Sequence, residues 1–362
     1  MTELLTLNKK DVKFSSYLNG TFSNTHRALP LQSLNVNTEQ EQVTFQIVPC
    51  QKIYASGMFQ RVRAGLRALK IRHWGLWFVP TCLIASLNLQ NGHDLSAAYF
   101  SSALGALFML ITAGLRNEVR DHLNGLDRLF PQAGSQVIQQ GWFAAHQLTK
   151  ASLVFVFLAV ICGLPAVLQD PNILWLIAVV AVFSAWIHFG DSVGIKFRHL
   201  TEWLVFFILG PFLTVGLQLS AGGALTEQVF YIGFLCGGAA LYFLFMKNWT
   251  QILVLGQAHL HNHNLNNTVT WLGFEKSKAL LEKSWLFLMT GWLLYHWFFS
   301  SFFWFSIMLL STLFVSLSML RILRRINSPV GSGLHVFKRV SIYSLTFLFS
   351  LWVLQSFWSL LF

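Results

Sequence analysis

A long apolar run passes without a break into a polar, acidic one at residues 98–127, which read AYFSSALGALFMLITAGLRNEVRDHLNGLD. Residues 98–115 have the length and composition of a membrane span. The next segment, Asn117 to Asp127, holds three acids and two asparagines, in a chain in which charged residues are only 11% of the total. Carboxylates and amides are costly to hold at the edge of a bilayer, so we expect this segment to serve a function.

The spacing of this segment predicts that its oxygen-bearing side chains share one side of a helix. Glu118 and Asp121 are three residues apart, and Asn117, Asp121 and Asn124 fall on one face. Carboxylate and amide oxygens suit Mg²⁺ that carries a phosphate group, rather than zinc or copper. The segment therefore predicts a magnesium and phosphate site at the end of a membrane helix. The alternative is a solvated loop whose acids pair with three neighbouring arginines.

The composition of the whole chain indicates a polytopic membrane protein. The 362 residues are 54% hydrophobic, with a mean hydropathy of +0.55, 34 Phe and 14 Trp, which is more apolar surface than a soluble domain of this length needs. Apolar windows of about 17–20 residues, the length of a transmembrane helix, recur along the chain. We predict an all-α, polytopic membrane helix bundle with about nine spans, although Phe298 to Phe303 offers almost no polar break between the seventh and the eighth. The predicted spans are residues 74–90, 96–115, 146–168, 172–188, 202–219, 227–246, 280–297, 300–320 and 341–361.

The positions of the basic residues predict the orientation of these spans. No Lys or Arg occurs in four of the connections, near residues 91–95, 169–171, 220–226 and 297–300, or at the C-terminal tip. All 25 Lys and Arg residues fall in the N-terminal segment, in the alternate connections or at the span ends beside them. This pattern predicts a multi-pass protein of the cell inner membrane, with a cytoplasmic N-terminus and the C-terminus outside. It also accounts for the net charge of +11 without nucleic acid, because no soluble surface gathers the basic residues.

The N-terminal part of the chain has a different character. Residues 1–56 are polar with little pattern, and we expect a cytoplasmic extension that is mostly disordered. Val43 to Val48 could form one strand, but a single strand cannot build a core. Over residues 57–71, apolar side chains recur at helical spacing among basic ones, which predicts an amphipathic helix at the cytoplasmic membrane surface. This helix would lead into the membrane domain, residues 57–362, unless it simply continues the first span.

The acidic segment resembles the first aspartate-rich motif of the UbiA superfamily of intramembrane prenyltransferases, N-D-x-x-D-x-x-x-x-x-D. Glu118 stands where the family has Asp, which keeps an oxygen ligand and adds one methylene. Gly134-Ser135 and then Gln139-Gln140-Gly141 follow at fitting distance, as in the 1,4-dihydroxy-2-naphthoate polyprenyltransferase (MenA) branch. The residues that fall on the pattern are Asn117, Asp121, Asn124, Gly125 and Asp127.

A second stretch carries the same resemblance. Residues 196–202, KFRHLTE, are similar to the family's K-Y-R-G-L-G-E before its fifth span, and a segment rich in Phe and Gly follows over residues 203–216. Lys196 and Arg198 could pair with diphosphate oxygens, Arg as a two-pronged donor and Lys as a point charge. The alternative is that both are ordinary positive-inside anchors. Arg72, just before the first span, resembles the arginine that opens the family's first helix.

The family's second aspartate-rich motif, D-x-x-x-D after its sixth span, is not matched. The corresponding stretch reads KNWTQ over residues 247–251, and Leu255 stands where the second aspartate should be. No acid occurs from Asn248 to Gly273, so a diphosphate would be held asymmetrically, without carboxylates for a second metal ion. The same region contains a His-x-His-x-His run that is open to three interpretations, namely a polar loop, a phosphate contact or a transition-metal site. Its members are His259, His261 and His263.

The resemblance implies Mg²⁺-dependent transfer of a polyprenyl group from its diphosphate to an aromatic acceptor of the quinone-precursor type. It implies that Mg²⁺ is held by Glu118, Asp121 and Asp127. Catalytic roles would fall to Asp121, Asp127, Lys196 and Arg198. Substrate contacts would come from Asn117, Asn124, Arg72, Gln251 and Asn248.

The expected partners are a polyprenyl diphosphate, an aromatic acceptor and membrane lipid, with no nucleic acid. Because the second motif is lost, the alternative is a catalytically diverged UbiA-like protein that binds an isoprenoid or lipid, or serves as a partner subunit. A transporter is disfavoured, because the acids lie at a loop rather than in the middle of a span.

Overall fold

The computed structural model describes residues 3–31, 42–55, 57–125, 127, 134–171, 174–175, 178–179, 200–252, 268–327 and 333–360. The chain divides into two compact units. The first consists of residues 1–74 and 107–160, and the second of residues 75–106 and 161–362. Two long helices, α5 (Ala97–Leu123) and α7 (Ala145–Gln169), contribute to both.

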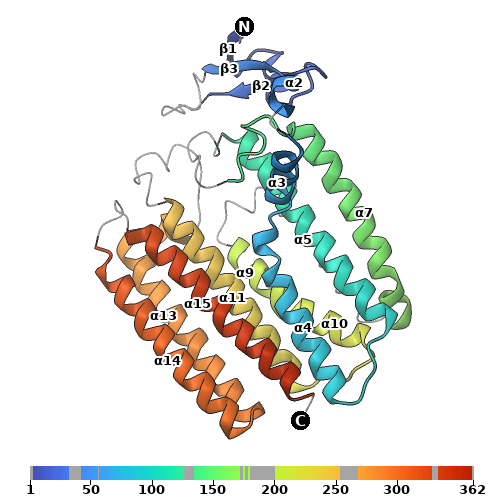
Figure 1. Ribbon diagram of the computed structural model, residues 1–362, viewed down its shortest axis with the longest axis vertical. Helices are drawn as coiled ribbons and strands as arrows, with labels where there is room; N and C mark the ends of the chain where they lie inside the picture. The colour runs from blue at the N-terminus through green and yellow to red at the C-terminus, as the bar shows by residue number, and fades with distance from the viewer. Residues whose placement is uncertain are drawn as a thin grey trace. The chain divides into compact units, whose positions relative to one another are not determined.

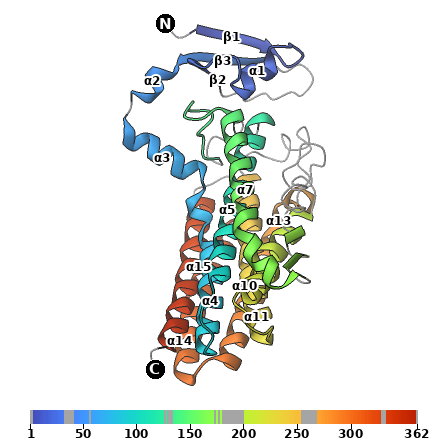
Figure 2. The same ribbon diagram turned by 90° about the vertical axis from the view of Figure 1, so that its right-hand side faces the viewer.

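The N-terminal segment of the first unit contains a folded sheet. Its strands are β1 (Glu3–Asn8), β2 (His26–Pro30) and β3 (Gln42–Pro49), and β3 lies between the other two with both pairings antiparallel. Helix α1 (Phe14–Asn19) lies against this sheet, as Figure 2 shows, and α2 (Cys50–Tyr54) follows β3. The buried residues that hold the sheet and α1 together are Leu7, Phe14, Leu18, Val43 and Phe45.

This sheet corrects the expectation of a disordered extension. The predicted strand at Val43 to Val48 is confirmed as part of β3, in which Val43 and Phe45 are buried. It can build a core because two short strands pair with it and α1 adds Phe14 and Leu18 from one face. The division of the chain at residue 56 stays a prediction.

The predicted amphipathic helix is present as α3 (Met58–Ala68), followed by a 3₁₀ turn, η1 (Ile71–His73). Its small residues Ala64 and Ala68 are buried, whereas Met58 and Phe59 are about 80% exposed, at 81% and 79%. An apolar helix face left open in this way suits contact with lipid. Its location at the cytoplasmic surface stays a prediction.

The remaining elements are the helices of a polytopic membrane bundle. Six helices in the described part of the chain are long and apolar enough to cross a membrane, and α4 is a shorter apolar helix. The predicted span 172–188 lies largely outside the described residues, so the total of nine stays a prediction. Besides α5 and α7, the helices are α4 (Gly75–Gln90), α9 (Leu200–Phe207), η3 (Ile208–Phe212), α10 (Leu213–Ser220), α11 (Glu227–Ile252), α13 (Thr268–Phe299), α14 (Phe302–Arg325) and α15 (Gly333–Trp358).

Helices α11, α13, α14 and α15 pack side by side in the second unit (Figure 1). The weakly marked boundary between the seventh and eighth spans falls at Ser300 and Ser301, which separate α13 from α14. Ser301 has extended backbone and begins α14, with Phe305 N donating to its carbonyl oxygen at 2.9 Å. A pair of serines is thus enough to end one helix and start the next.

A close glycine contact joins η3 to α11 in the same unit. Gly210 has non-helical backbone inside η3 and is followed by Pro211, which kinks the segment. A Cβ at Gly210 would lie 2.4 Å from the Gly233 carbonyl oxygen, and one at Gly237 would lie 2.4 Å from the Phe206 carbonyl oxygen. Small residues of this kind let membrane helices approach backbone to backbone.

Candidate functional site

The acidic segment begins on the last turns of α5 and continues into the turn after it. Helix α5 ends at Leu123, and Gly125 follows with a φ of +77°, a conformation that favours glycine. Gly125 N donates to the His122 carbonyl oxygen at 3.1 Å, which closes the last turn. The left-handed glycine therefore turns the chain off the helix before Asp127.

Asn117 and Asp121 lie together on the predicted face of α5. The Asn117 amide nitrogen donates to Asp121 Oδ2 at 2.7 Å, and both side chains are partly exposed. The bond leaves the carbonyl oxygen of Asn117 as a second acceptor beside the carboxylate. Asn124, the third member of the face, is exposed.

Glu118 is buried and its charge is compensated. Its side chain is 2% exposed, and Lys70 Nζ lies 2.9 Å from its Oε1. The backbone nitrogen of Ser135 donates to Oε2 at 3.2 Å, and the Ser135 hydroxyl makes a short bond to the same oxygen. One cation and two neutral donors therefore engage a carboxylate that the sequence predicts to be a metal ligand.

Asp127 is the other buried acid, at 3% exposed. Gln139 Nε2 donates to its Oδ2 at 2.9 Å, and Gln136 Nε2 donates to its backbone carbonyl at 3.2 Å. Burial, reinforced by the charges of Glu118 and Asp121, raises the pKa of the Asp127 carboxyl to about 7. A nearby cation would stabilise the ionised form of Asp127, because a cation offsets the cost of burying the carboxylate charge.

Gly134 makes room for Asp127. A Cβ at this position would lie 2.4 Å from Asp127 Oδ1. The Gly134-Ser135 pair that follows the acidic segment therefore has two separate tasks. Gly134 leaves room for the Asp127 carboxylate, and Ser135 donates hydrogen bonds to the Glu118 carboxylate.

A hydrogen-bonded chain links Asp127 to the N-terminal sheet region. His122, 1% exposed, lies with Nε2 2.8 Å from the Leu18 carbonyl oxygen, and this oxygen can only accept. Nε2 therefore carries the hydrogen, and Nδ1 accepts from Gln139 Nε2 at 3.1 Å. Because Gln139 donates its other hydrogen to Asp127, one amide group aligns both side chains.

The sequence resemblance included Gln139 but gave no role to His122 or Lys70. The rest of the Gln-Gln-Gly step supports the same region, since Arg67 of α3 donates to Gln140 Oε1 at 3.3 Å. Gly141 has a φ of +78°, and a Cβ there would lie 2.6 Å from Ile53 Cδ1. The Gln-Gln-Gly step is thus a structural support for the acidic segment.

The donor set suits Mg²⁺ in part. Among the described residues, no three His, Cys, Asp or Glu side chains are grouped closely enough to hold a metal ion by themselves. Mg²⁺ usually takes one or two carboxylates and completes its shell with water and substrate phosphate oxygens. Asn117, Asp121 and Asp127 can supply such a partial shell, whereas Glu118 is already bound by Lys70 and Ser135.

The other predicted site residues lie in the second unit, outside the described residues, or, as Arg72 in η1, have a side chain that is not described. Asn248 is partly exposed near the end of α11, and its neighbour Trp249 is fully buried, stacked on Phe274 at a ring distance of 5.6 Å. Glu202 is buried and bonded to the Thr268 hydroxyl. Predictions that fall outside the described residues concern Lys196, Arg198, Leu255, His259, His261, His263 and the side chains of Arg72 and Gln251.

Comparison with known proteins identifies solved structures with a similar fold. The sequence matches no protein-family model. No curated protein matches it either. Among solved structures, a UbiA homolog from Archaeoglobus fulgidus bound to GPP and Mg²⁺ matches with a TM-score of 0.53 and 12% identity, over 80% of this chain and 99% of that one.

Two further structures give the same result. The DMAPP- and Mg²⁺-bound form of the Archaeoglobus fulgidus homolog matches with a TM-score of 0.51 and 11% identity, over 79% of this chain and 98% of that one. A digeranylgeranylglyceryl phosphate synthase matches with a TM-score of 0.53 and 9% identity, over 82% of this chain and 99% of that one. Over about 80% of its length the chain has the fold of the UbiA-type intramembrane prenyltransferases, a polytopic bundle of membrane helices, to which this chain adds the N-terminal sheet.

Proposed function

We propose that this protein is a Mg²⁺-dependent intramembrane prenyltransferase. The observation that carries the proposal is that a chain with the fold of the UbiA homologs places Asn117, Asp121 and the buried Asp127 at the end of one membrane helix. Two of those homolog structures contain a short prenyl diphosphate and Mg²⁺. We infer that a prenyl diphosphate with Mg²⁺ is also the ligand of this acidic segment.

The chain's own residues would then act in two groups. Asn117, Asp121 and Asp127 hold the metal ion, and Glu118 with Lys70 and Ser135 keeps the surrounding turn in place. When bound, Mg²⁺ neutralises charge on the diphosphate as it leaves. Lys196 and Arg198, which the sequence resemblance brings to this role, pair with the remaining phosphate oxygens.

The proposed reaction replaces a carbon–oxygen bond by a carbon–carbon bond. The bond between the first prenyl carbon and the diphosphate breaks, and the diphosphate takes the electron pair. The allylic cation that remains is attacked by a ring carbon of an electron-rich aromatic acceptor, and the ring then loses a proton. Helices that exclude water protect the cation until the acceptor reaches it.

The proposals for the acceptor, the membrane and the orientation rest on the sequence. The Gly-Ser and Gln-Gln-Gly steps favour an acceptor of the quinone-precursor type, as in the 1,4-dihydroxy-2-naphthoate (menaquinone) branch. The fold alone does not choose an acceptor, since one of the structural neighbours is named for a glyceryl phosphate product. The charge pattern favours the cell inner membrane, with the N-terminus in the cytoplasm and the C-terminus outside.

One observation favours a second function, binding without prenyl transfer. The stretch at residues 247–251 carries no carboxylate, and Leu255 stands in the place of the last aspartate. Lys70 also engages Glu118, which removes one more carboxylate from metal binding. A diverged protein of this fold would bind an isoprenoid or lipid, or act as a partner subunit.

A direct assay distinguishes the two functions. The purified full-length protein would be incubated with Mg²⁺, a labelled polyprenyl diphosphate and candidate aromatic acceptors, beside Asp121→Ala and a matched control, Asp94→Ala, in the exposed connection after α4. Release of diphosphate that requires Mg²⁺, Asp121 and an acceptor supports prenyl transfer. Mg²⁺-dependent binding of the diphosphate without release with any acceptor favours the second function, and the absence of both binding and release contradicts prenyl transfer.

A further inference from the structure

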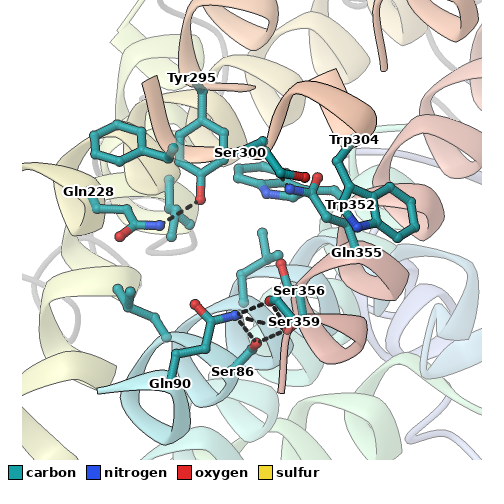
Figure 3. Close-up of a pocket in the computed structure, with 15 residues that line it drawn as sticks. Ser86, Gln90, Gln228, Tyr295, Ser300, Trp304, Trp352, Gln355, Ser356 and Ser359 are labelled. Atoms are coloured by element: carbon teal, nitrogen blue, oxygen red, sulfur yellow. Dashed lines mark hydrogen bonds between the residues drawn. The ribbon is translucent and has the colours of Figure 1, made fainter. Parts of the chain in front are cut away.

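The second unit contains a cavity that belongs to neither aspartate-rich motif. It has a volume of about 170 Å³ and opens between the ends of α4, α11, α13 and α15 (Figure 3). Gln228 lines it at the start of α11, and Asn248 lies 20 residues further along the same helix (248 minus 228), roughly 30 Å away at 1.5 Å per residue. A hydrophobic membrane thickness therefore separates the cavity from the predicted second-motif position.

The lining of the cavity is polar but uncharged. Among the described residues, no Asp, Glu, Lys or Arg contributes to it, and its polar side chains are glutamines, serines and Tyr295. A charged ligand would leave its charge unpaired in such a site, which is costly. The cavity therefore suits a neutral ligand.

Gln90 fixes one wall of the cavity. Its Nε2 donates to the Ser356 carbonyl oxygen at 2.9 Å and to Ser359 Oγ at 2.6 Å. Because a backbone carbonyl can only accept, these bonds decide which way the amide faces. The carbonyl oxygen of Gln90 accepts no hydrogen bond from any described residue, so it is an available acceptor.

Gln355 supplies a buried acceptor on the opposite side. Its Nε2 donates to Ser300 Oγ at 2.6 Å, whereas its Oε1 is buried without a partner among the described residues. The side chain is only 8% exposed and lies in the cavity lining (Figure 3). A buried amide oxygen left without a donor has lost its hydration without compensation, so a ligand or water that donates to it would stabilise the site.

Gln228 donates its Nε2 to the Tyr295 hydroxyl at 3.0 Å, so a third amide uses its nitrogen and offers its oxygen. Gln90 is exposed and Gln228 is partly exposed, so the Gln355 oxygen is the buried acceptor of the three, and a ligand O–H group would supply its donor. Anions and quinone carbonyls, which only accept, do not meet this requirement.

Aromatic rings complete the cavity. Trp304 and Trp352 both line it, and the Trp352 ring packs on the Tyr295 ring at 4.7 Å. Flat aromatic faces pack well on the C–H groups of a ring or chain whose hydroxyls point sideways. A polyhydroxylated group fits this lining, because its hydroxyls can reach the amide oxygens while its C–H groups pack on the aromatic faces.

We propose that this cavity binds a neutral, hydroxyl-rich group, either the glycerol or sugar head group of an uncharged lipid or the same kind of polyol free in water. Its volume of about 170 Å³ accommodates a head group and not an acyl chain. The site is independent of prenyl transfer, because none of its lining residues belongs to the acidic segment or to residues 247–251.

The test uses the full-length protein in lipid nanodiscs. An octyl β-glucoside that carries a photoreactive diazirine on the sugar would be crosslinked, and the adducts mapped by mass spectrometry. Competition with unlabelled octyl β-glucoside tests for a saturable site, and octyl tetraethylene glycol ether, with the same chain and a single hydroxyl, is the head-group control. Methyl β-glucoside, which lacks the chain, distinguishes a lipid source from a free polyol.

The variants are Gln355→Leu and Gln90→Leu, with Gln169→Leu at the exposed end of α7 as the matched control. We expect saturable adducts on the cavity segments around Gln90 and Gln355, competition by octyl glucoside but not by the ether, and at least a fivefold loss of labelling in both cavity variants. Because Gln90 is exposed, its variant tests the site even if Gln355→Leu folds poorly. Equal competition by the ether, or labelling that both cavity variants leave unchanged, would overturn the proposal.

Discussion

Gln139 donates a 2.9 Å hydrogen bond to the Asp127 carboxylate, twelve residues earlier in the chain. The same amide nitrogen lies 3.1 Å from His122 Nδ1, whose ring reaches the Leu18 carbonyl oxygen. A residue of the turn after α5 is thereby connected to the N-terminal sheet region. The predicted diphosphate site thus depends on segments that no aspartate-rich motif contains.

The first prediction concerns Gln139 itself. Gln139→Leu removes the donor that stabilises ionised Asp127, so the pKa of Asp127 rises further and its affinity for Mg²⁺ falls. We expect Mg²⁺-dependent binding of a prenyl diphosphate to weaken by about 10–100-fold, the usual effect of losing a partner of a metal ligand. Gln140→Leu is the matched control, because Gln140 binds Arg67 instead. Equal loss in both variants would argue against a specific role for Gln139.

The second prediction concerns the connection to the sheet. His122→Phe keeps a ring but leaves the buried Leu18 carbonyl oxygen without its donor, which costs about 1–3 kcal/mol. Hydrogen exchange should accelerate in residues 14–30 and in the turn around Gln139, measured by mass spectrometry on the full-length protein. His335→Phe, at an exposed position of α15, should leave exchange in these segments unchanged. If His122→Phe also leaves hydrogen exchange in these segments unchanged, His122 does not stabilise the contact between the turn after α5 and the N-terminal sheet region.

The third prediction concerns pH. Because burial raises the pKa of Asp127 from 3.8 to about 7, the folded state holds this proton more tightly than the unfolded state. The contribution of protonated Asp127 to stability is complete below about pH 4 and is lost as pH rises through about 7. Melting curves from pH 4 to 8 should show a decline that Asp127→Asn removes and that Mg²⁺ reduces in the wild type. A melting temperature of Asp127→Asn that declines with pH as steeply as that of the wild type would contradict this role of Asp127.

The fourth prediction concerns the glycine contact of the second unit. Gly237→Ala places a methyl group 2.4 Å from the Phe206 backbone oxygen, which a side-chain rotation cannot relieve. We expect destabilisation of about 1–3 kcal/mol, typical of an overpacked interface, seen as a lower melting temperature in detergent. Gly163→Ala in α7 is the control, because a Cβ there meets nothing within 4 Å. A melting temperature lowered equally in the two variants would contradict the close approach of α9 and α11.

The sequence predicted those features of the fold and of the site that depend on local helical periodicity. Apolar run lengths placed most of the described membrane helices, and the spacing of Asn117 and Asp121 placed them together, because residues four apart on a helix are neighbours. The roles of Lys70 and Gln139 could not be predicted in this way. Lys70 contacts Glu118, and Gln139 contacts Asp127, where the chain turns at residues with positive φ. Helical periodicity does not predict which side chain points toward an acid after such a turn.

The N-terminal sheet was missed for a related reason. Its strands of five to eight residues pair across long connections, and part of its core comes from α1. Only β3 carries an alternation strong enough to see in the sequence, at Val43 and Phe45. Pairing partners far apart in the chain, rather than local pattern, decide whether such a segment folds.

The most direct test of the central proposal is a binding measurement with a soluble short-chain prenyl diphosphate. Affinity would be measured with and without Mg²⁺ for the wild type, Asp121→Ala and the Asp94→Ala control. We predict binding that requires Mg²⁺, falls by about 10–100-fold in Asp121→Ala and is unchanged in the control. Binding that is independent of Mg²⁺, or equally strong in Asp121→Ala, would contradict a diphosphate site at the end of α5.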